Sequence, residues 1–96
     1  MTNKIISYVG EDLIIECKNL PKMGQNILID AENGRVIIAR VHDLIGRANA
    51  PYAVATFLRD SRKYIKSYEE LINMPVYYGG VRKKNKYQKY QTRGGR

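Results

Sequence analysis

Short runs of β-branched and other apolar residues recur along residues 1–79, with turn-forming residues between them. Runs of this length and composition favour strands over helices. The expected strands cover residues 4–9, 13–18, 26–30, 35–44, 52–58 and 74–78. Strands this short and numerous are typical of an all-β sandwich or barrel, whereas βαβ units would need helical segments between them.

Turn signals separate the expected strands. Gly10-Glu11-Asp12 predicts a tight turn, and Asn33-Gly34 predicts a hairpin because both residues tolerate positive φ angles. Pro21 and Gly24 predict a loop.

A single helical turn is expected at residues 67–72, where Ser67 can cap the backbone of Glu70 and the Glu70 side chain can return the bond. Asn73 and Pro75 end it. Six short strands with so little helix would leave exposed sheet edges unless the sheet closes on itself. We therefore expect a small, six-stranded closed barrel.

The net charge of +8 divides unevenly along the chain. All nine acidic residues lie between Glu11 and Glu70, whereas seven of the seventeen Lys and Arg residues follow Gly80. Residues 1–79 are therefore almost neutral, and residues 80–96 carry only positive charge. The latter segment cannot bury enough apolar surface to offset the entropy of ordering, so we expect one domain at 1–79 and a disordered basic tail at 80–96.

The tail has a composition suited to RNA. Its tyrosines are interleaved with cations, so bases could stack on the rings while the cations neutralise phosphates. A solubilising charged terminus is the alternative. The expected RNA-contacting residues are Arg82, Lys83, Lys84, Lys86, Tyr87, Lys89, Tyr90, Arg93 and Arg96.

Few residues could support catalysis. His42 and its neighbour Asp43 are expected to point to opposite faces of a strand. Cys17 continues an apolar alternation, so a buried thiol is expected rather than a nucleophile. One Cys and one His are too few for a zinc site. We therefore expect no catalytic residue, cofactor or metal.

The single cysteine cannot form an intramolecular disulfide, and the first residues lack the long apolar stretch of a signal peptide. We therefore expect an intracellular, cytoplasmic protein without a membrane span.

Three expected strands are apolar on both faces, at residues 13–15, 27–29 and 36–39. A sheet with one solvated face does not show this pattern, so something must cover the second face. The loop at residues 20–23 and the turn at Leu71-Ile72 could do so. We favour a partner protein as the cover.

The segment Val41-His42-Asp43-Leu44-Ile45-Gly46-Arg47, followed by Pro51-Tyr52 and Ala53-Val54-Ala55, resembles the signature of the glycine-and-arginine-rich (GAR) subunit of box H/ACA ribonucleoproteins. The resemblance extends over about residues 5–79 in the order and spacing of strands. It implies a six-stranded barrel related to the second domain of translation GTPases. Because the chain has only Arg93-Gly94-Gly95-Arg96 in place of long Arg-Gly-Gly repeats, it looks like the short archaeal form, and a nucleolar location is not expected.

The resemblance also implies a partner, the dyskerin-like or TruB-like pseudouridine synthase subunit, which carries the catalytic aspartate of the complex. The GAR subunit would then be non-catalytic and would aid loading and release of substrate rRNA, with guide and substrate RNA reached through the complex and the basic tail. The expected docking residues are Ile37, Ala39, Ile45, Gly46, Arg47, Pro51, Tyr52 and Val54.

Two other classes of function remain open. A stand-alone RNA-binding barrel, acting in ribosome assembly or RNA processing, would need basic and aromatic residues gathered on one barrel face. The near-neutral charge of residues 1–79 argues against it. A small barrel enzyme would need a catalytic constellation, for which the sequence offers no evident candidate.

Overall fold

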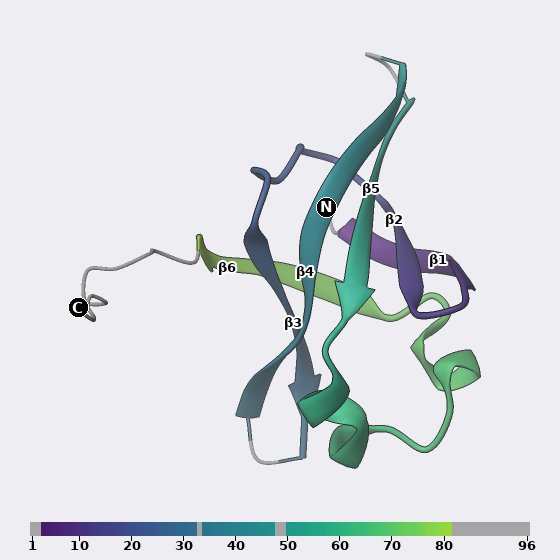
Figure 1. Cartoon of the computed structure of the whole chain (residues 1–96), viewed down its shortest axis with the longest axis vertical. Coiled ribbons are helices and arrows are strands. Elements are labelled where there is room, and N and C mark those ends of the chain that lie inside the picture. The colour runs from purple at the N-terminus through teal and green to yellow at the C-terminus, as the bar shows by residue number, and fades with distance from the viewer. Residues whose placement is uncertain (1–2, 33, 48–49, 82–96) are drawn as a thin grey trace, which may run out of the picture.

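The computed structural model describes residues 3–32, 34–47 and 50–81 (Figure 1). Its strands form a closed antiparallel barrel in the order β1-β2-β5-β4-β3-β6. The expected small, six-stranded closed barrel is thereby confirmed. The strands are β1 (Asn3–Val9), β2 (Asp12–Glu16), β3 (Gln25–Ala31), β4 (Gly34–Arg47), β5 (Ala50–Phe57) and β6 (Pro75–Val81).

The β2–β3 and β5–β6 connections differ in kind. An irregular loop joins β2 to β3, as Pro21 and Gly24 predicted, and two short 3-10 helices join β5 to β6. These helices are η1 (Arg59–Tyr64) and η2 (Tyr68–Leu71). No helix in the described part of the chain is long and apolar enough to cross a membrane.

Alternating side chains from all six strands fill the inside of the barrel. Since successive strand residues point to opposite faces, closure directs one apolar set inward. Burying one Val, Leu or Ile side chain stabilises a fold by about 1.5–3 kcal/mol. The largest fully buried side chains are Ile5, Leu13, Ile15, Ile27, Ile38, Leu71 and Val76.

The helical turn forms where it was expected, but the predicted capping box is wrong. Ser67 makes no side-chain cap bond, and its carbonyl oxygen accepts the Glu70 N–H at 3.3 Å. The Glu70 carboxylate instead accepts the Lys66 N–H at 2.6 Å. In a 3-10 helix the backbone carbonyl of each residue accepts the N–H of the third residue along the chain. The Ser67 carbonyl therefore already accepts the Glu70 N–H that the Ser67 side chain was expected to cap.

Helix η1 was not predicted, because its sequence is polar and has no apolar periodicity. Two bonds to β4 hold it against the barrel. The Leu58 N–H donates to the Ile38 carbonyl at 2.8 Å, and the buried Ser61 hydroxyl donates to the Ile37 carbonyl at 2.7 Å. These contacts come from tertiary structure, which local sequence patterns do not report.

The tail boundary also shifts. Strand β6 continues through Gly80 to Val81, and the backbone of Val81 lies opposite Gln25 of β3. The first residues of the predicted tail therefore belong to the barrel. The expected disorder and the proposed RNA contacts fall on residues 82–96, which lie outside the described residues.

Candidate docking surface on the β4–β5 hairpin

Strands β4 and β5 form the longest hairpin, which projects beyond the rest of the barrel (Figure 1). Ala53 and Ala55 of β5 face the core, so Tyr52 and Val54 face outward. Ile45 of β4 lies directly opposite Tyr52 and is 45% exposed. Three of the expected docking residues are thus brought onto one outer surface.

Strand β2 extends this surface on the other side of β5. Its Ile14 lies opposite Val54, and its Glu16 lies opposite Tyr52. We call the apolar surface formed by Ile14, Ile45, Tyr52 and Val54 the outer patch. Ile14 was not among the predicted docking residues, although the two-sided apolar pattern of residues 13–15 was a signal for it. Glu16 flanks the patch on β2 and Asp43, opposite Val54, flanks it on β4.

Gly46, Pro51 and Arg47 lie toward the tip of the hairpin. Gly46 pairs with Pro51 and has a φ of 99°, a backbone conformation that residues with a Cβ atom rarely adopt. The backbone of Arg47 pairs with Ala50. The Arg47 side chain lies outside the described part of the structure, so its predicted directional contact stays a prediction.

Two predicted docking residues lie elsewhere. Ala39 is fully buried opposite Phe57, so its assignment to a surface is corrected. Ile37 is 41% exposed but lies opposite Leu28 of β3, away from the outer patch. The different positions of Ile37 and Ala39 result from a bulge at Ile38, which has no partner residue on β3. A bulge shifts the alternation, so Ile37 and Ala39 point to opposite sides despite their spacing of two.

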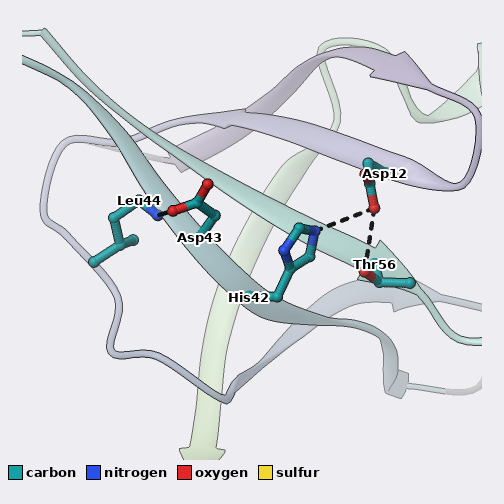
Figure 2. A network of polar contacts seen from close by, with 5 residues as sticks. All are labelled: Asp12, His42, Asp43, Leu44 and Thr56. Atoms are coloured by element: carbon teal, nitrogen blue, oxygen red, sulfur yellow. Dashed lines mark hydrogen bonds and ion pairs between the residues drawn. The ribbon is translucent and has the colours of Figure 1, made fainter.

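A second bulge, at His42, changes the expected geometry of His42 and Asp43. Both residues are exposed rather than divided between two faces. Figure 2 shows that they do not contact each other. The Oδ1 atom of Asp43 accepts the Leu44 N–H at 2.9 Å, which keeps this carboxylate on its own strand.

The imidazole of His42 contacts a different carboxylate. Its Nε2 atom lies 3.2 Å from the Oδ1 atom of Asp12 on β2, and the Thr56 hydroxyl donates to the same oxygen at 3.1 Å (Figure 2). The network joins three neighbouring strands on the outside of the barrel. The His42 and Asp12 side chains are 48% and 43% exposed, so the pair is an exposed contact between strands. Within the described residues, no group of three His, Cys, Asp or Glu residues could hold a metal ion.

Cys17 is buried, as predicted. Its thiol lies 3.5 Å from the Ile15 carbonyl oxygen, and the residue as a whole is 5% exposed. Burial raises the pKa of the thiol, and the neighbouring Tyr78 hydroxyl opposes that effect only in part. A thiol with a raised pKa is a poor nucleophile at neutral pH.

The loop and the turn that could have covered the outer face lie in other places. Leu71 is fully buried and packs into the core. Leu20 and Met23 are each more than half exposed. These segments leave Ile45 of the outer patch accessible.

Together, these features define the chain as a small closed β-barrel whose projecting hairpin and neighbouring strand β2 carry a partly exposed apolar patch. Comparison with protein-family models, with curated proteins and with solved structures gave no match. The particular function is therefore inferred from the residues and their arrangement.

Proposed function

We propose that this chain is a non-catalytic accessory subunit of a box H/ACA RNA-guided pseudouridine synthase. In this proposal the outer patch binds the dyskerin-like or TruB-like catalytic subunit. The complex acts on ribosomal RNA in ribosome biogenesis, and this chain aids loading and release of the substrate. The active site belongs to the partner.

One observation carries the proposal. The segment that resembles the GAR signature, residues 41–55, is also the segment that places Ile45, Tyr52 and Val54 on one accessible surface. A tyrosine beside aliphatic side chains is typical of the buried centre of protein interfaces, where a few residues, often including tyrosine, contribute most of the binding energy. The carboxylates of Glu16 and Asp43 would form a polar rim around that centre.

The basic tail supports an RNA-associated role. Residues 82–96 carry seven Lys and Arg residues and no acidic residue. Such a segment attracts phosphates without reading sequence, which suits an accessory subunit better than a sequence-specific binder. Tail contacts would hold substrate RNA close to the synthase while guide pairing selects the site.

Co-purification with a box H/ACA synthase subunit tests the proposal. We expect the full chain to form a one-to-one complex that survives nuclease treatment, because the contact is between proteins. Retention of RNA alone, with loss of the synthase after nuclease treatment, would contradict the proposal and favour the stand-alone RNA-binding barrel.

A further inference from the structure

The first half of the loop between β5 and β6, residues 59–66, gathers positive charge, whereas the second half carries Glu69 and Glu70. Residues 59–66 contain four cations and a single acid, Asp60. The rest of residues 1–79 carries more acids than cations, so this segment accounts for the small positive charge of the barrel region. All four cations are exposed, and neither of the ion pairs formed among the described residues involves them. The four are Arg59, Arg62, Lys63 and Lys66.

Helix η1 holds this charge in a defined place. The Ser61 hydroxyl is bonded to the backbone of β4, and Ile65 packs against the core. The Arg62 guanidinium lies 5.7 Å from the centroid of the Tyr68 ring, which itself packs edge to face on Phe57. The backbone that carries these cations is therefore held against the barrel. Figure 1 shows that η1 lies at the end of the molecule opposite the β4–β5 hairpin tip.

A hollow adjoins η1, with a volume of about 260 Å³. Ala31 and Val36 provide apolar lining, and Glu32, Lys63 and Tyr64 complete it. Tyr64 is 43% exposed, and the Lys63 ammonium lies 5.5 Å from its ring centroid. Pockets for drug-sized ligands measure about 300–1,000 Å³, so this smaller hollow has room for one small group, such as a single base.

We propose that η1 and this hollow bind single-stranded RNA. An unpaired base would stack on Tyr64 beside Val36, and the cations of η1 would neutralise the adjoining phosphates. The Glu32 carboxylate can accept hydrogen bonds from the amino or imino group of the base. This contact goes beyond the proposed function, which assigns RNA to the tail, and it does not require the synthase.

Salt-dependent RNA binding by the full chain tests the charge of η1. The probe is a fluorescein-labelled, single-stranded RNA of mixed sequence and about 12 nucleotides, followed by anisotropy. Arg62→Gln combined with Lys63→Gln should flatten the plot of log affinity against log salt by about 1.4, since each phosphate contact to a single strand contributes about 0.7. Lys18→Gln combined with Lys22→Gln, at exposed positions in another loop, should leave the slope unchanged. An equal change in both pairs would overturn the proposal, because it would show a general charge effect.

Substitution of Tyr64 tests stacking. Tyr64→Leu should weaken RNA binding about tenfold, while Tyr64→Phe retains it, because stacking needs the ring but not the hydroxyl. Photo-crosslinking of the wild-type chain to 4-thiouridine RNA gives a readout that needs no variant. Crosslinks to residues 59–66 are expected, and crosslinks confined to 82–96 would refute the site. Synthase binding is not used in either measurement, so these outcomes are separate from those of the docking proposal.

Discussion

Ile45 on β4 lies directly opposite Tyr52 on β5, and both belong to the outer patch. A pair in this position shields part of each side chain yet leaves Ile45 45% exposed. The pair therefore stabilises the hairpin, and the exposed part of Ile45 remains available to a partner. This relationship gives the docking proposal its most direct test.

Tyr52→Ala together with Ile45→Asp should release the chain from the synthase without unfolding it. Truncating a buried interface tyrosine costs on the order of 2 kcal/mol, and the added aspartate would be unpaired in the interface. We expect binding to weaken at least thirtyfold, since each 1.4 kcal/mol is about tenfold. Calorimetry after thermal melts measures this.

Two controls accompany that variant. Ile37→Asp changes an isoleucine of similar exposure on the β3 side of the barrel, and Lys84→Ala with Lys86→Ala changes the tail. Both should keep nearly native affinity for the synthase. If Ile37→Asp releases the synthase and the patch variant does not, the docking surface lies over β3 and β4 instead.

Replacing His42, Asp43 or Cys17 singly with alanine should preserve pseudouridine formation by the reconstituted complex. His42 and Asp43 bond to groups on this chain's own strands, and Cys17 is buried with a raised pKa. Moderate losses through folding are compatible with this role. A variant that binds RNA and synthase normally yet lacks all activity in a tritium-release assay would place the active site in this chain.

Deleting residues 82–96 should leave both the barrel and synthase binding intact, because β6 ends at Val81. RNA affinity should respond less steeply to salt, by roughly 0.7 in slope for each phosphate that the tail neutralises in the full chain. Fluorescence anisotropy across a salt series measures the slope. An unchanged slope would mean that the tail touches no phosphate.

Stability should fall as pH rises above about 9. Burial raises the pKa of Cys17 above its ordinary 9.0 and that of Tyr78 far above its ordinary 10.0. Above those ordinary values the unfolded chain loses protons that the folded chain keeps, so the free energy of unfolding decreases with pH. Urea unfolding between about pH 8 and pH 11 should show a shallower decline for Tyr78→Phe than for the wild type. Parallel curves would contradict this assignment.

Gly46→Ala should destabilise the protein by about 1–3 kcal/mol, because a φ of 99° is strained for any residue with a Cβ. Gly80→Ala is the matched control, since it has no positive φ and its added Cβ would meet no atom within 4 Å. Urea unfolding of both variants compares them. Equal stability of the two would show that the hairpin adapts without strain.

Much of the fold follows from local patterns in the sequence. All six strands lie where the β-branched runs placed them, within a few residues at each end. The buried thiol of Cys17 likewise follows from alternation with Leu13 and Ile15. These features are predictable because a strand repeats every two residues and a closed barrel buries one of its faces.

Tertiary structure alone decided which outward residues share a surface. The bulges at Ile38 and His42 reverse the alternation within β4, so Ala39 enters the core and His42 reaches Asp12 on another strand. A bulge depends on the register of two paired strands, and neither strand specifies it alone. The same holds for Ile14, which joins Tyr52 and Val54 through the pairing of β2 with β5. The runs of apolar residues thus determined the strands and the barrel's interior, while strand pairing determined its outer surfaces.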